Sequence, residues 1–172
     1  PPPLMPNASR TAVLLDACSP EFPDHLAHHH PDAHYFVPFR VRLSFWRGRD
    51  RGWIARGSGD YVAYAASFRR AVWRSLQARA TQGRRQAGMV DGWRWLAKAY
   101  ARRLTPLHTT LVVAQELLPH LELLGVLGGR QVEVLASTLP MASIHERLDA
   151  AARQWPSESS LRDFRASDSM VE

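Results

Sequence analysis

Short apolar runs alternate along the chain with segments that have a helical pattern. The first run covers residues 11–15, and a weaker extended segment covers residues 34–39. Residues 109–114 are β-branched and nearly all apolar, which is typical of a strand covered on both faces. Residues 131–136 form a further predicted strand, and alternation over residues 41–46 indicates a weak one.

Two helices are predicted in the middle of the chain. Asp60 is placed to cap the first, because its side chain can accept from the first exposed amides. Large apolar side chains recur along that helix at a spacing that predicts a face packed on the core: Tyr61, Tyr64, Phe68, Val72 and Leu76. Asp91 is placed to cap the second, after a loop over residues 83–88, and Pro106 ends it.

Two more helices are predicted after the later strands. Residues 115–127 have a helical pattern, with Pro119 in the first turn and Gly125, Gly128 and Gly129 as the C-terminal stop. Ser143 and Glu146 have the spacing of a capping box. The last helix carries one apolar stripe, which we expect to pack on the sheet: Ile144, Leu148, Ala151, Ala152 and Trp155.

The strand–helix–strand–helix unit over residues 107–155 predicts an α/β fold with a parallel sheet and flanking helices. We divide the chain into a loose segment at 1–10 and one domain at 11–156. The domain carries an arginine- and aromatic-rich helical insertion at about 57–104. Residues 157–172 are polar and are expected to be a linker or a truncated end.

Composition limits the class of protein and its compartment. No apolar run is long enough for a membrane-spanning helix, which leaves only peripheral membrane contact open. Cys18 is the only cysteine, which fits a reducing, cytoplasmic compartment. The chain has no Met at position 1 and stops after a polar stretch, so we expect a fragment of a longer protein.

Charge is unevenly distributed. Residues 40–103 hold 16 Lys and Arg against 3 Asp and Glu, whereas the whole chain has a net charge of +6. Arginine interleaved with aromatic side chains can bind single-stranded nucleic acid, which makes a non-enzymatic nucleic-acid-binding module one alternative. We rank this alternative below a second interpretation, in which the two helices pack on the sheet and their arginines lie in water.

The carboxyl ends of the predicted strands provide the first set of candidate site residues. Ligands of open parallel sheets bind beyond these ends. Candidate ligand-binding residues at this edge are polar and follow a strand directly: Asp16, Ser19, Gln115, Ser137 and Thr138. Glu116 is a candidate catalytic residue there. The competing interpretation is that each begins a turn or satisfies loop backbone.

The histidines between His25 and His34 are a second candidate site. Imidazoles beside Asp24 and Asp32 are ligand types for zinc or iron, so a metal-dependent enzyme is a further alternative. The spacing matches no known metal motif, so we predict no metal ligands. A general base on a histidine-rich loop is the stronger enzymatic reading, with His30 and His34 as candidates. The simplest interpretation of this segment is a solvent-exposed loop without a catalytic role.

Two stretches resemble a known family. Residues 107–119 (LHTTLVVAQELLP) and 132–141 (VEVLASTLPM) together resemble the N-terminal domain of bacterial glycosyltransferases of the two-domain GT-B type. The resemblance implies a Rossmann-like domain that holds a small-molecule or glycan acceptor. It also implies that a separate C-terminal domain, absent from this chain, binds the nucleotide-sugar donor. This chain would then bind no cofactor, and alone it would be inactive.

The chain departs from better-marked members of that family. Ala17, Cys18, Ser19 and Pro20 stand where a glycine-rich loop would follow the first strand. No phosphate-binding G-x-x-x-x-G-K-[ST] or G-x-G-x-x-G motif follows a strand either.

Overall fold

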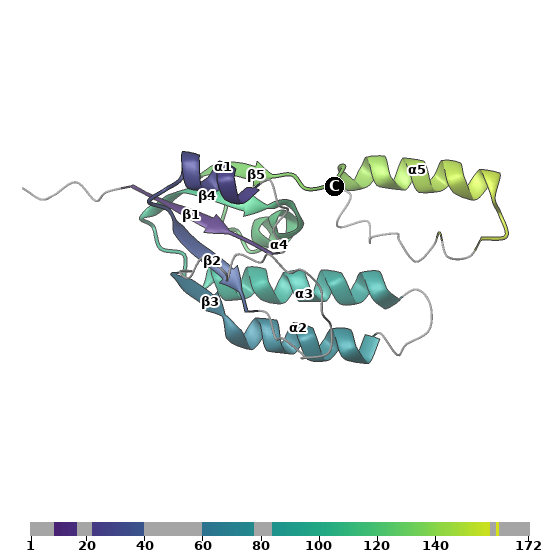
Figure 1. Cartoon of the computed structure of the whole chain (residues 1–172), viewed down its shortest axis with the longest axis horizontal. Coiled ribbons are helices and arrows are strands. Elements are labelled where there is room, and N and C mark those ends of the chain that lie inside the picture. Colours follow the sequence, from purple (N-terminus) through teal and green to yellow (C-terminus); the bar gives the residue numbers. More distant parts are fainter. Residues whose placement is uncertain (1–8, 17–21, 40–59, 78–83, 159–160, 162–172) are drawn as a thin grey trace, which may run out of the picture.

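A five-stranded parallel sheet forms the centre of the protein (Figure 1). The structure, a computed structural model, describes residues 9–16, 22–39, 60–77, 84–158 and 161. The strands are β1 (Arg10–Leu14), β2 (His34–Pro38), β3 (Tyr61–Ala63), β4 (His108–Ala114) and β5 (Gln131–Leu135). Every neighbouring pair is parallel, in the order β3-β2-β1-β4-β5, so the predicted α/β class is confirmed.

This strand order makes the sheet Rossmann-like. The chain moves outward from β1 through β2 to β3, and then returns to the other side of β1 to form β4 and β5. The direction of winding therefore reverses between β1 and β4, and ligands of such sheets bind at the carboxyl edge of that point.

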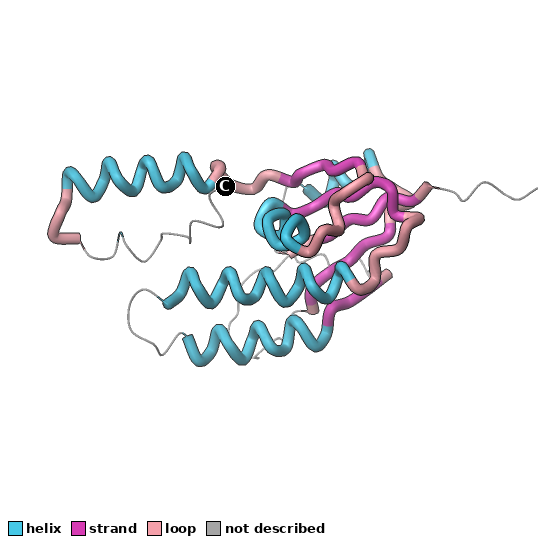
Figure 2. The backbone as a smooth tube through the Cα atoms, turned by 180° about the vertical axis from the view of Figure 1, so that it is seen from behind, coloured by secondary structure: helices cyan, strands magenta, loops and turns pink. Residues whose placement is uncertain are grey.

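Helices cover both faces of the sheet (Figure 2). The helices of the described residues are α1 (Phe22–His29), α2 (Tyr64–Gln77), α3 (Arg84–Ala101), the short 3-10 helix η2 (Gln115–Leu117), α4 (Leu118–Leu123) and α5 (Met141–Gln154). Helix α1 lies on one face, α3 and α4 lie on the other, and α2 packs alongside α3. Within the described residues, no helix combines the length and apolar character needed to cross a membrane.

Alternate residues of the strands face two separate cores. Ala12, Leu14 and Val113 point toward α3 and α4, where they meet Leu96 and Leu121. Val13, Leu15 and Val112 point toward α1, where they form a smaller core with Leu26 of that helix. The C-terminal parts of β1 and β4 are buried on both faces, which explains why residues 12–14 and 111–114 are all apolar.

Two predicted loops are helical in the structure. The histidine-rich segment contains α1, with Pro23 in the first turn, where a missing amide costs little. Asp24 lies in the same turn, where a negative charge is favourable. Helix α3 begins at Arg84, within the predicted loop over residues 83–88, so the cap predicted at Asp91 is wrong.

The cap predicted at Asp60 is also wrong. Tyr61–Ala63 is the edge strand β3, and α2 begins only at Tyr64. The Asp60 carboxylate accepts a hydrogen bond from the Tyr35 backbone amide at 2.7 Å, and so ties β3 to the start of β2.

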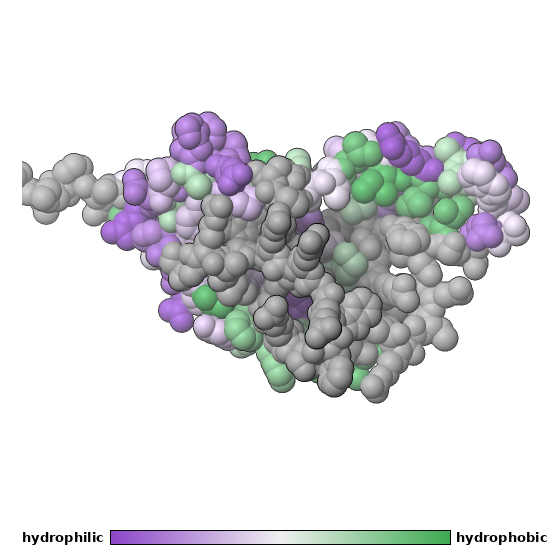
Figure 3. Space-filling model, viewed as in Figure 1, coloured by the Kyte–Doolittle hydropathy of each residue, from purple (hydrophilic) through white to green (hydrophobic). Residues whose placement is uncertain are grey.

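Helix α5 does not pack on the sheet as its apolar stripe predicts. It extends beyond the carboxyl edge of the sheet, and none of its residues is buried (Figure 1). The predicted capping box is wrong as well, because the helix begins after Pro140 without a side-chain cap. Apolar surface on α5 is visible in Figure 3.

Some expectations concern residues outside those the structure describes. These are the weak strand over residues 41–46, the candidate Ser19, and most of the segments 1–10 and 157–172.

Gly92 of α3 gives α2 room to approach. A Cβ atom at this position would lie 3.0 Å from Cγ and 3.1 Å from Cδ of Arg70, a side chain that is 10% exposed. We predict that Gly92→Ala lowers stability, because a steric cost of about 1–3 kcal/mol exceeds the gain of about 1 kcal/mol in helix propensity. Urea unfolding measures the change. Gly128→Ala, with open space around its Cβ position, is the control, and a higher midpoint for Gly92→Ala would contradict the prediction.

Candidate functional site

Polar side chains gather where β4 and β5 end. The two strands pair in register up to their last residues, so the segments that follow leave the sheet side by side. Gln115 Oε1 accepts from the Thr138 backbone amide at 3.2 Å and from its hydroxyl at 3.4 Å. The Ser137 hydroxyl donates to Glu116 Oε1 at 2.9 Å. Four residues predicted for this edge therefore lie together, and we call them the carboxyl-edge cluster.

The carboxyl-edge cluster has the chemistry to hold a hydroxylated ligand. Gln115, Glu116 and Ser137 are half-buried, so a ligand can reach them. Among the described residues, the second carboxylate oxygen of Glu116 has no hydrogen-bond partner. A carboxylate so placed can accept a hydrogen bond or a proton from a ligand hydroxyl, while the Gln115 amide and Thr138 hydroxyl supply neutral groups.

Asp16, at the end of β1, forms a buried ion pair with Arg70. Its Oδ2 accepts from Arg70 Nη2 of α2 at 2.9 Å and from Trp93 Nε1 of α3 at 2.7 Å. Its Oδ1 accepts from Arg70 Nη1. The side chains of Arg70 and Asp16 are only 10% and 6% exposed. In this arrangement the Asp16 carboxylate holds two helices at the end of β1 and is not presented to a ligand.

Tyr100 makes a second buried attachment at the same strand end. Its hydroxyl donates to the Leu15 carbonyl oxygen at 2.8 Å. Burial raises the pKa of Tyr100 well above its ordinary value, and the neighbouring negative charge of Asp16 adds to that effect. Tyr100 is therefore a neutral donor at any physiological pH, and it fixes α3 against β1.

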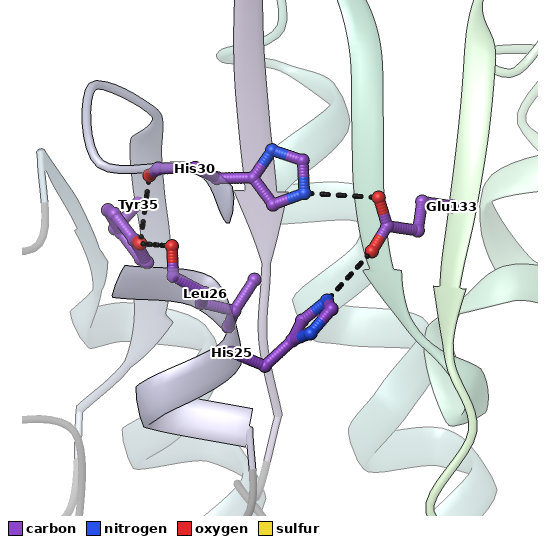
Figure 4. A network of polar contacts seen from close by, with 5 residues as sticks. All are labelled: His25, Leu26, His30, Tyr35 and Glu133. Carbon is purple, nitrogen blue, oxygen red and sulfur yellow. Dashed lines mark hydrogen bonds and ion pairs between the residues drawn. The ribbon is translucent and has the colours of Figure 1, made fainter. Parts of the chain in front are cut away.

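Glu133 of β5 lies between two histidines from the segment of α1 (Figure 4). Its Oε1 is 3.2 Å from His25 Nε2, and its Oε2 is 3.0 Å from His30 Nε2. Burial acts to raise the pKa of Glu133, but hydrogen bonds from the two histidines and their charges outweigh it. The pKa therefore lies below its ordinary value. This His–Glu–His contact joins α1 to the sheet edge.

His34 and His108 meet at the opposite, amino edge of the sheet. The Thr105 backbone amide donates to His108 Nδ1 at 3.0 Å, so the neutral ring of His108 carries its proton on Nε2. That nitrogen lies 3.2 Å from His34 Nδ1 and can donate to it. Burial lowers the pKa of His108, and the nearby charges of His34 and Arg10 lower it further.

The structure therefore separates the three predicted catalytic residues. Glu116 lies at the carboxyl edge, His34 lies at the amino edge, and His30 contacts Glu133 within β5. Within the described part of the chain, no group of three or more His, Cys, Asp or Glu side chains is arranged to hold a metal ion.

Sequence reasoning missed Arg70, Trp93 and Glu133. The sequence pattern places Arg70 among the arginines expected in water, and it indicates no polar role for Trp93. One clue was available, because Asp16 directly follows the apolar run over residues 12–15, and a carboxylate buried there needs a cationic partner. Nothing in the local pattern identified which arginine would supply it.

Comparison with known protein families, with curated proteins and with solved structures finds no match for this chain. We therefore assign the candidate site from the geometry of the carboxyl-edge cluster.

We predict strong coupling between Asp16 and Arg70. Arg70→Met should cost about 3–5 kcal/mol of unfolding free energy, because it leaves a buried carboxylate without its cation. The double variant Asp16→Asn/Arg70→Met should recover much of that loss, since no unpaired charge remains. Urea unfolding of the single and double variants measures the coupling. Lys98→Met is the control, since Lys98 is exposed on α3, and additive losses would contradict the prediction.

A pH dependence follows from the lowered pKa of Glu133. A lowered carboxyl pKa stabilises the fold above the ordinary value of 4.5, and this stabilisation is lost as the pH falls through the folded-state pKa. We therefore expect Glu133→Gln to unfold at lower urea concentration than wild type near neutral pH, and this difference should shrink below pH 4.5.

Glu122→Gln is the matched control for this measurement, because Glu122 is an exposed residue of α4. A difference between wild type and Glu133→Gln that stays constant down to pH 3 would show that the carboxylate charge contributes nothing.

Proposed function

We propose that this chain is the acceptor-side domain of a glycosyltransferase, which moves a sugar from a nucleotide-sugar donor to a hydroxyl group of a small-molecule or glycan acceptor. The observation that carries this proposal is the carboxyl-edge cluster, in which Glu116 and Gln115 lie beside Ser137 and Thr138. One carboxylate among neutral hydrogen-bonding groups suits a ligand that is rich in hydroxyls.

The fold and the sequence resemblance support the same proposal. The parallel order β3-β2-β1-β4-β5 is Rossmann-like, as the resemblance implies. The residues that carry the resemblance, at 107–119 and 132–141, include β4 and β5 and the segments that follow them. The cluster thus lies within the resembling stretches, next to the reversal of winding between β1 and β4.

In this scheme Glu116 is the general base. The acceptor oxygen attacks the anomeric carbon of the donor sugar as its proton passes to the Glu116 carboxylate. The bond between that carbon and the diphosphate oxygen breaks, and the nucleoside diphosphate leaves with the bonding electrons. Gln115 and Thr138 position the acceptor by hydrogen bonds. His30 and His34 take no part here, because each is engaged with a side chain elsewhere.

The donor would be held by a second, C-terminal domain, as in the family that the sequence resembles. The proposed setting is the cytoplasm, where nucleotide-sugars are made and a lone cysteine stays reduced.

The test uses the whole natural polypeptide that contains this chain. We expect it to release a nucleoside diphosphate from at least one of UDP-glucose, UDP-N-acetylglucosamine and GDP-mannose in the presence of a hydroxylated acceptor. Glu116→Gln should lower kcat by about 100-fold, since a general base contributes about 10²–10⁴-fold. Gln115→Ala should raise the acceptor KM about five-fold, the value of one hydrogen bond, and leave the donor KM unchanged.

Glu122→Gln should leave these rates at wild-type values, because Glu122 is exposed on α4. No diphosphate release from any of the three donors, or full activity in Glu116→Gln, would contradict the proposal.

A further inference from the structure

Helix α2 exposes its apolar face. Four large side chains at four-residue intervals are in solvent, with exposed fractions of 61% for Tyr64, 62% for Phe68, 45% for Val72 and 55% for Leu76. Residues four apart lie on one side of a helix, so these side chains form a continuous ridge, which we call the α2 stripe. Phe39 prolongs it, since its ring centroid is 4.9 Å from that of Tyr64.

The opposite side of α2 is the buried one, although it is polar. Ser67 and Arg70 are buried, where Ser67 accepts from the Phe39 backbone amide at 2.9 Å and Arg70 pairs with Asp16. Ser67 and Arg70 are three positions apart, so the two share a face, which lies across the helix from the stripe. The ion pair thus fixes the helix in a rotation that leaves its apolar face outside.

An open groove of about 500 Å³ borders the α2 stripe on the side of α3. The groove shares Phe68 and Val72 with the stripe and is flanked by Arg69 and Arg94. The Arg69 guanidinium lies 4.2 Å above the centre of the Trp95 ring. Cations and a tryptophan therefore lie directly beside the apolar ridge.

The charge around the stripe is almost all of one sign. Helix α2 has no acidic residue. Apart from the buried Arg70, α2 and α3 together hold six Lys and Arg against the single Asp91. Asp91 is itself paired with Arg94, with Oδ1 and Nη2 2.5 Å apart. A partner for this face must therefore supply both apolar contact and negative charge.

We propose that the α2 stripe is a binding site for a membrane surface that contains anionic lipid. An amphipathic helix with bulky apolar side chains on one side and arginines beside them lies in the plane of a bilayer, with its apolar side among the acyl chains. The cations of α2 and α3 then meet the anionic headgroups. This inference stands independently of glycosyl transfer.

Two other occupants fit the face less well. A second copy of the chain would bring the same basic surface against itself about a two-fold axis. Single-stranded nucleic acid supplies negative charge and can stack on rings, but the aliphatic side chains Val72 and Leu76 offer no stacking surface. Acyl chains account for the aliphatic and the aromatic parts of the stripe alike.

The test is co-sedimentation of the full chain with vesicles of phosphatidylcholine alone or with three parts in ten phosphatidylglycerol. We expect binding to the anionic vesicles, weaker binding to the neutral ones, and a decrease as salt is raised. Phe68→Glu/Leu76→Glu should bind the anionic vesicles at least ten-fold more weakly. Both side chains are exposed, so the variant should fold, and circular dichroism checks that it does.

Leu123→Glu is the matched control. Leu123 is 78% exposed on α4, outside the stripe, and this variant should bind like wild type. Three results would overturn the inference: no binding to anionic vesicles, equal loss of binding in the control, or unchanged binding in the stripe variant. Binding of a single-stranded RNA dodecamer without vesicle binding would overturn it in favour of nucleic acid. A dimer in solution that only the stripe variant loses, again without vesicle binding, would overturn it in favour of self-association.

Discussion

The ion pair between Asp16 and Arg70 determines how the helices of this protein meet its sheet. The Asp16 carboxylate ends the central strand in a site with almost no solvent, where an unpaired charge is very unfavourable. Arg70 reaches it from α2, passing Gly92 of α3, and Trp93 supplies a further hydrogen bond. One carboxylate thereby connects a strand and two helices that are far apart in the sequence.

That constraint produces the two surfaces to which we attribute function. Because α2 must turn Arg70 inward, its aromatic and aliphatic side chains face outward beside arginines. Asp16 is buried in its ion pair. The polar side chains that remain accessible at the carboxyl edge are therefore those that follow β4 and β5, and they hydrogen-bond to one another. A membrane-facing helix and a hydroxyl-binding edge would together suit an enzyme whose acceptor lies at a lipid surface.

The parts of the fold that could be predicted are those whose pattern is local. The apolar runs at residues 12–14 and 111–114 lie in β1 and β4, whereas β5 alternates polar and apolar residues over 131–134. Gly125, with φ of +68°, follows the end of α4, but the helix predicted over residues 115–127 is divided into η2 and α4 and stops at Leu123. The gathering of Gln115, Glu116, Ser137 and Thr138 also followed from the sequence, because parallel strands end at one edge. The rotation of α2 could not be predicted, since an apolar stripe is ordinarily buried and the ion pair that overrides it joins residues 54 positions apart.

The histidine cluster shows the same division. The sequence alone determined that imidazoles gather between His25 and His34, and that apolar strands alternate with helices in an α/β protein. Only the tertiary structure decided that His25 and His30 hold Glu133 while His34 meets His108 across the sheet. The periodicity of a sequence shows which side of a helix or strand is apolar. The partner of a buried charge, in contrast, lies in a distant segment of the chain, and only the fold determines which segment is close enough.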